Sequence, residues 1–117
     1  MRIIVVGSSN TDMIFQTPRI PKPGETLLGG KFQTAAGGKG ANQAVAAARL
    51  GAQVTLVGCT GADAFGAGMR TALSREGVDI SHVLEAGDEA TGVALIQVDS
   101  RGRNSIAVAS GANFRLS

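Results

Sequence analysis

Gly37-Gly38-Lys39-Gly40-Ala41-Asn42 stands immediately before an alanine-rich pattern with helical spacing. Glycine allows other groups to approach the backbone closely and adopts conformations that other residues resist. The start of the helix would offer unpaired N–H groups, and Lys39 and Asn42 would add side-chain donors at the same end. The stretch therefore predicts a cradle for a polar ligand at the start of a helix.

Two standard phosphate-binding loops do not fit this stretch. A Walker A loop requires Gly-x-x-x-x-Gly-Lys followed by Ser or Thr, but Gly40 follows Lys39 and Gln33 occupies the position of the first glycine. A dinucleotide-binding fingerprint that starts at Gly38 would need a third glycine where Gln43 stands. A plain glycine-rich connection that enters a helix stays open as the alternative.

The patterns on both sides of the cradle predict an α/β fold. Residues 3–6 are a continuous β-branched run, typical of a buried parallel strand, and residues 53–57 form a second such strand that ends at Gly58. The helix between them would bury a face of small side chains, Ala41, Ala44, Val45 and Ala48. Asp63 can cap a second helix, whose apolar face would consist of Phe65, Met69, Ala72 and Leu73. The alternating order predicts a sheet with helices packed on it.

Two segments do not follow this alternation. Residues 13–33 have no helical period and contain all 3 prolines of the chain. Residues 92–109 predict a hairpin that turns near residues 99–102. Its first strand, residues 93–98, is apolar on both faces and therefore expects cover on both. A ligand, a partner subunit or the body of the protein could supply that cover, and the hairpin could equally belong to the main core.

Asn10 and Asp12 directly follow the first predicted strand. Ligands of open α/β sheets bind outside the carboxyl ends of the strands, so we expect both side chains at the same rim as the cradle. Asp12 is a charged acceptor, Asn10 and Asn42 can donate and accept, and Lys39 only donates. This set suits a polyol, because one carboxylate can accept hydrogen bonds from two hydroxyl groups. An ordinary turn is the alternative role for Asp12.

Composition argues against several other classes of protein. The 117 residues suffice for one modest domain. The net charge is +2 and the basic residues are scattered along the chain, so no nucleic-acid-binding surface is predicted. No apolar run approaches the roughly 18 residues of a membrane-spanning helix. His82, the single histidine, has no neighbours with metal-ligand spacing, so no metal site is predicted. Cys59, the single cysteine, is expected to be a buried thiol in a reducing, cytoplasmic compartment.

Several stretches resemble, in order, the N-terminal portion of the ribokinase-like, phosphofructokinase-B-type sugar kinase family. They are residues 7–12, 23–26, 37–44, 59–63, 91–96 and 111–113. Several ordered motifs are far more specific than one glycine-rich loop. The resemblance implies that residues 1–117 form the N-terminal part of a single Rossmann-type layered α/β domain. It also implies a small β-sheet lid formed by residues from about 13 to 34 and from about 91 to 110.

The resemblance further implies an activity and its site. The positions that match pentose-binding residues of the family are Asn10, Asp12, Gly38, Lys39 and Asn42. Ala94 and Val108 match apolar lid positions that face the sugar. The implied reaction is ATP-dependent phosphorylation of D-ribose to D-ribose 5-phosphate with Mg²⁺, and K⁺ is a candidate monovalent cofactor. Paired lids imply a homodimer.

One feature of the family is missing from this sequence. The catalytic aspartate of the family lies in a C-terminal Gly-Ala-Gly-Asp motif, which does not occur here, since Gly61-Ala62-Asp63 lacks the second glycine. No catalytic residue is therefore assigned, and the 117-residue chain alone is expected to be inactive. Two alternatives stay open: another sugar or nucleoside kinase of the same family, and a non-catalytic sugar-binding or dimerisation module.

Overall fold

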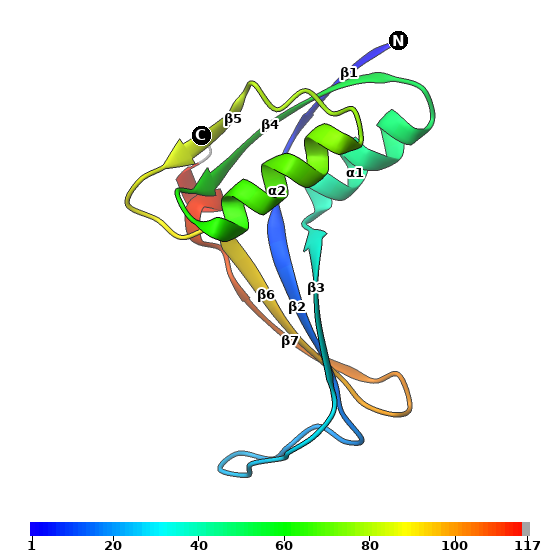
Figure 1. Cartoon of the computed structure of the whole chain (residues 1–117), viewed down its shortest axis with the longest axis vertical. Coiled ribbons are helices and arrows are strands. Elements are labelled where there is room, and N and C mark those ends of the chain that lie inside the picture. The colour runs from blue at the N-terminus through cyan, green and yellow to red at the C-terminus, as the bar shows by residue number, and fades with distance from the viewer. Residues whose placement is uncertain (116–117) are drawn as a thin grey trace.

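The computed structural model describes residues 1–115, which form two sheets, two α-helices and a short 3₁₀ helix (Figure 1). The first sheet has the order β1-β4-β5 and consists of β1 (Arg2–Val6), β4 (Gln53–Gly61) and β5 (Val83–Ala86). The second sheet has the order β3-β2-β6-β7 and consists of β2 (Asn10–Gln16), β3 (Lys31–Gly37), β6 (Gly92–Val98) and β7 (Asn104–Ala109). The helices are α1 (Lys39–Arg49), α2 (Ala64–Arg75) and η1 (Gly111–Arg115). Neither α-helix within residues 1–115 is long and apolar enough to cross a membrane.

The first sheet and both α-helices share one hydrophobic core, which confirms the predicted α/β arrangement. Its buried members include Val5, Ala41, Ala44, Val54, Leu56, Met69 and Leu73. Because the side chains of the alanines are short, α1 lies close to β1 and β4. The strand β1 pairs in parallel with β4, as the β-branched run predicts. Only one of its faces is covered by residues 1–115, because Ile4 and Val6 are 70% and 66% exposed.

Two details of this layer differ from the sequence prediction. The strand β4 continues beyond Gly58 to Gly61, because residues 58–61 pair in parallel with β5. Phe65 is exposed, whereas its predicted neighbours on the helix face, Met69 and Leu73, are buried. The first turn of α2 lies over the junction with the second sheet, where Phe65 borders a hollow shared with Thr11. Phe65 is therefore not packed against the hydrophobic core.

Asp63 connects α2 to the second sheet. Its carboxylate accepts a hydrogen bond from Gly66 N–H at 2.8 Å, which is the predicted helix cap. It also accepts from the backbone N–H and the hydroxyl of Thr91, at 2.9 and 2.6 Å. Burial alone would raise the pKa of Asp63, but the hydrogen bonds from Thr91 and Gly66 outweigh it and lower the pKa. The residue before β6 is thus held against the start of α2.

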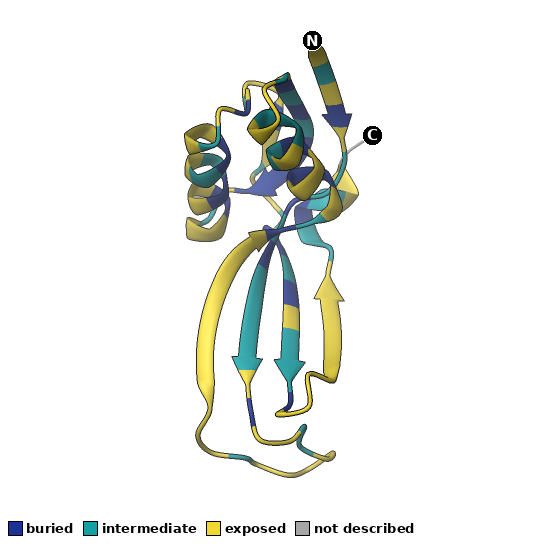
Figure 2. Cartoon of the chain, turned by 90° about the vertical axis from the view of Figure 1, so that its right-hand side faces the viewer, coloured by how far each residue is buried: buried dark blue, intermediate teal, exposed yellow. Residues whose placement is uncertain are grey.

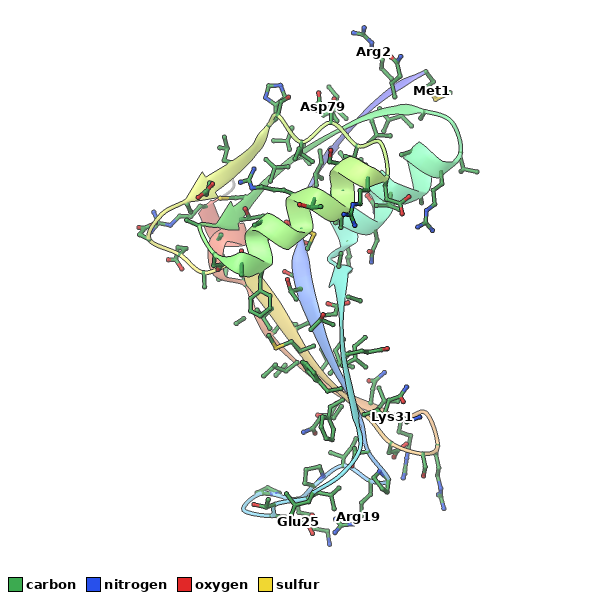
Figure 3. All side chains as sticks on the ribbon, in the orientation of Figure 1. Met1, Arg2, Arg19, Glu25, Lys31 and Asp79 are labelled. Atoms are coloured by element: carbon green, nitrogen blue, oxygen red, sulfur yellow. The ribbon has the colours of Figure 1, made fainter. Side chains whose placement is uncertain are left out.

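The second sheet extends away from the core, and β3 and β7 are exposed along most of their length (Figure 2). The predicted hairpin is present as β6 and β7, closed by a turn at residues 99–102. The sheet begins at Asn10 and includes Gly37, so it takes in more residues than the segments expected from the sequence. At its far end Arg19 and Glu25 form two hydrogen bonds of 2.6 Å (Figure 3). These bonds, together with one from Lys22 N–H, lower the pKa of Glu25 to about 2.

Residues 1–115 leave the face of β6 that carries Leu95 largely uncovered, so the cover that the sequence predicts would come from a ligand or a partner subunit. Ala94 on the other face is buried, but Leu95 is 53% exposed. Near the core, residues 1–115 therefore bury one face of β6, the face that carries Ala94.

Candidate functional site

Asn10 and Asp12 lie on β2, where the second sheet leaves the core. The sequence predicts both at the rim beyond the first strand, and in the structure a second strand begins there. Asn10 is paired in register with Gly37 on β3 and with Gly92 on β6. Residues two apart on a strand share a face, so the side chains of Asn10 and Asp12 point to the same side. Because both of its cross-strand partners are glycines, no side chain from β3 or β6 flanks the Asn10 amide.

Asp12 lies in a row of small apolar residues on the same face. Its partner on β6 is Ala94, and the partner of Ala94 on β7 is Val108. Ala94 is 6% exposed and Val108 is 58% exposed. The register therefore brings together one carboxylate and the two apolar positions that the resemblance assigns to the lid.

The glycines of the cradle allow the chain to pack against itself. A Cβ atom at Gly38, where φ is 93°, would lie 2.7 Å from the carbonyl oxygen of Ser8. A Cβ atom at Gly40 would lie 2.7 Å from the carbonyl carbon of Gly7. The N–H of Ala41 donates to the oxygen of Ser8 at 3.0 Å. The close backbone approach is therefore between the start of α1 and residues 7–10, and it sets Asn10 beside the helix start.

Asp12 offers a carboxylate without a hydrogen-bonded partner among the described residues. Burial alone raises its pKa, whereas any strong donor to the carboxylate would lower it. A side chain at position 37 would overlap the carboxylate, so Gly37 provides the space that Asp12 occupies. A partly desolvated acceptor of this kind is suited to take hydrogen bonds from ligand hydroxyl groups.

Lys39 and Asn42 lie in the first turn of α1, where no side chain caps the helix. Both are exposed, and Lys39 forms no ion pair within residues 1–115. Asn42 borders a groove of about 380 Å³ between α1 and α2, together with Val45 and Glu76. The structure thus brings Asn10 and Asp12 together with the backbone before α1. It places Lys39 and Asn42 on the adjacent helix start, and among residues 1–115 neither side chain is hydrogen-bonded to Asn10 or Asp12.

Asn113 is a site neighbour that the sequence did not assign. It belongs to one of the ordered stretches, but its role is visible only in the fold, where its Nδ2 donates to Asn10 Oδ1 at 2.7 Å. The two residues are 103 positions apart. Local periodicity carries no signal over such a separation.

The described residues do not fit a magnesium site. Within residues 1–115 no group of three His, Cys, Asp or Glu side chains gathers to hold a metal ion. His82 is exposed. No metal-assisted step is therefore assigned to these residues.

The chain is similar to known proteins over nearly its whole length. A sequence profile described as pfkB family carbohydrate kinase matches residues 1–117. The ribokinase of Haemophilus influenzae is 51% identical over 115 residues, which are 98% of this chain and 38% of that protein. Ribokinase from Cryptococcus neoformans in complex with ADP has a TM-score of 0.84 at 44% identity, with 93% of this chain and 34% of that one covered. Arabidopsis thaliana ribokinase complexed with ribose and ATP has a TM-score of 0.85 at 43% identity, with 94% and 36% covered.

Proposed function

The chain belongs to the pfkB family of carbohydrate kinases, and from this premise we propose that it supplies the sugar-binding and lid portion of an ATP-dependent ribokinase. The reaction would transfer the γ-phosphoryl group of ATP to the terminal hydroxyl of D-ribose. The chain spans about 38% of the length of the Haemophilus influenzae ribokinase, so the activity concerns the whole protein. The unpartnered carboxylate of Asp12, beside Asn10 on an open face of β2, is the observation that carries this proposal.

Each site residue has a role in this proposal. Asp12 accepts hydrogen bonds from two ribose hydroxyl groups, and Asn10 contacts a third oxygen. The backbone at Gly38 and the side chains of Lys39 and Asn42 add donors from the start of α1. The second sheet acts as a lid that covers the sugar and excludes water, which otherwise competes as the phosphoryl acceptor.

Other components of the reaction come from outside the described residues. The Gly-Ala-Gly-Asp motif of the family does not occur in this sequence, and no cluster within residues 1–115 fits Mg²⁺. We therefore propose that the catalytic base and most of the ATP, Mg²⁺ and K⁺ sites lie elsewhere in the protein. The buried free thiol of Cys59 fits a reducing cytoplasm.

A substrate comparison tests the proposed function. The protein as its gene encodes it and the chain of residues 1–117 are each supplied with ATP, Mg²⁺ and ribose, fructose or adenosine. We expect the whole protein to phosphorylate ribose with a kcat/KM at least about tenfold above the other two acceptors, and residues 1–117 alone to give no turnover. A preference for fructose or adenosine would show that this acceptor, and not ribose, is the substrate. A reading frame that ends at residue 117 would favour a non-catalytic sugar-binding module.

We also propose that two copies pair through the lid. Ile14, Ile96 and Ile106 are partners across β2, β6 and β7, so they form an apolar row on the face that carries Asp12. Ile106 is 54% exposed. A row of this kind on a projecting sheet is the type of surface that a second copy covers.

Ile106→Lys is expected to convert the dimer of the whole protein to a monomer, because a charge would be buried in the contact. Ser105→Lys is the matched control, since Ser105 is an exposed neighbour on β7 that points to the opposite face. Sedimentation velocity measures both variants. A dimer that persists in Ile106→Lys would contradict pairing through this face.

A further inference from the structure

The side-chain amide of Asn113 is oriented by the backbone of Ser9. Ser9 N–H donates to Asn113 Oδ1 at 3.0 Å, and Asn113 Nδ2 donates to the carbonyl oxygen of Ser9 at 3.1 Å. A backbone N–H can only donate and a carbonyl oxygen can only accept. The reversed amide would place two donors together and two acceptors together. The backbone of Ser9, which is fully buried, therefore determines which end of the Asn113 amide is nitrogen.

The orientation of Asn113 in turn determines that of Asn10. The second N–H of Asn113 Nδ2 donates to Asn10 Oδ1 at 2.7 Å. Asn10 must present its oxygen to this donor, so its own NH₂ group points away from Asn113. The shape of an asparagine side chain does not distinguish oxygen from nitrogen. Here a chain of hydrogen bonds that begins at the backbone distinguishes them for both residues.

Gly92 provides the space in which the two amides meet. A side chain at position 92 would overlap both Asn10 Oδ1 and Asn113 Nδ2 and would come within 2.9 Å of the oxygen of Ser110. The backbone angle φ of Gly92 is not positive, so its conformation alone does not require glycine. The requirement at this position is room for the pair of amides.

We propose that Asn113 is a positioning residue that makes Asn10 a committed hydrogen-bond donor to the sugar. This inference rests on the proposed sugar site. Asn10 presents NH₂ and Asp12 presents a carboxylate on the same face of one strand. The site therefore selects a sugar oxygen that accepts a hydrogen bond next to hydroxyl groups that donate them. Asn113 acts through Asn10 and does not contact the sugar.

The first test asks whether Asn10 donates a hydrogen bond to the sugar or accepts one, by titration calorimetry of the whole protein with ribose. Asn10→Asp keeps an acceptor for Asn113 Nδ2 and leaves both bonds to Ser9 intact, but it presents oxygen to the sugar. We expect Asn10→Asp and Asn10→Ala each to weaken ribose binding by about tenfold to a hundredfold. An affinity of Asn10→Asp equal to that of the unmodified protein would show that Asn10 accepts, and would overturn the proposal.

The role of Asn113 is tested with Asn113→Asp and a panel of singly deoxygenated ribose analogues. The carboxylate that this substitution introduces keeps an acceptor for Ser9 N–H but presents an acceptor to Asn10, whose amide must then turn around. We expect Asn113→Asp to weaken ribose binding about as much as Asn10→Ala does. The double variant that carries both substitutions should bind ribose no more weakly than either single variant. The analogue that lacks the oxygen bound by Asn10 should bind all of these variants as well as it binds the unmodified protein.

The outcomes separate this inference from the proposed function. A purely structural role for Asn113 would lower the affinity for every analogue by the same factor, and that result would overturn the inference while ribose binding by the unmodified protein stands. An unmodified protein that binds no sugar would reject the proposed function, and the inference would fail with it.

Discussion

Replacing Asp12 by alanine is expected to weaken ribose binding to the whole protein by about a hundredfold or more. The carboxylate would accept two charge-assisted hydrogen bonds, each of which contributes about 1.5–3 kcal/mol. Since about 1.4 kcal/mol corresponds to a factor of ten in affinity, the loss of both exceeds the effect expected at any other single site residue. Titration calorimetry of the purified protein measures the loss, and unchanged affinity would reject the role assigned to Asp12.

Two further variants of β2 separate charge from position. Asp12→Asn keeps one acceptor oxygen and removes the charge, so an intermediate loss is expected. Gln16→Ala changes an exposed residue on the same face of β2, farther from the core, and should leave ribose affinity unchanged. Burial raises the pKa of Asp12. Because binding requires the carboxylate, affinity should be full above this raised pKa and should fall as the pH drops through it, an effect that Asp12→Asn should lack.

Gly38→Ala is expected to destabilise the protein by about 3 kcal/mol or more, the sum of two unfavourable contributions. Its φ of 93° is a conformation that residues with a side chain rarely adopt. Its Cβ atom would also lie 2.7 Å from Ser8 O, 2.8 Å from Ser9 Cα and 2.9 Å from Asn10 N. These are backbone atoms, so relief requires moving the start of β2 away from α1. Ribose affinity should fall together with stability, because Asn10 lies at the start of β2 and would be displaced with that strand.

Gly51→Ala is the matched control for this prediction. Gly51 has nearly the same backbone angle, φ 95°, but nothing lies within 4 Å of a Cβ atom placed there. It should therefore show the conformational strain alone, about 1–3 kcal/mol, and unaltered ribose affinity. Urea unfolding at constant pH measures both variants. Equal losses of stability would mean that the contact between the start of α1 and residues 7–10 contributes nothing.

Much of the fold could be predicted from short-range patterns. The β-branched run of β1, the alanine face of α1, the Asp63 cap and the β6–β7 hairpin are each set by residues within a few positions of one another. The strand β5 and the extension of β4 to Gly61 could not be predicted, because they depend on each other across the sheet. Phe65 has the spacing of a core residue, but what lies beneath it is decided by the position of the second sheet.

The sequence by itself determined the chemistry that is present at the candidate site. An acceptor at Asp12, an amide at Asn10 and a glycine-rich start to α1 are local features, and their order along the chain resembles one family of sugar kinases. The same resemblance also implied the apolar positions Ala94, within a matched stretch, and Val108, between two of them.

Only the tertiary structure decided how these groups act together. The sequence suggests that Gly38 lets a ligand approach the backbone, and the structure adds that the missing side chain also makes room for the backbone of Ser8. The sequence leaves Asn10 free to donate or accept, but Asn113, 103 residues away, takes its oxygen and leaves its NH₂ group available. The physical reason is that steric overlap and hydrogen-bond direction depend on distances between strands. Spacing along the chain does not contain those distances.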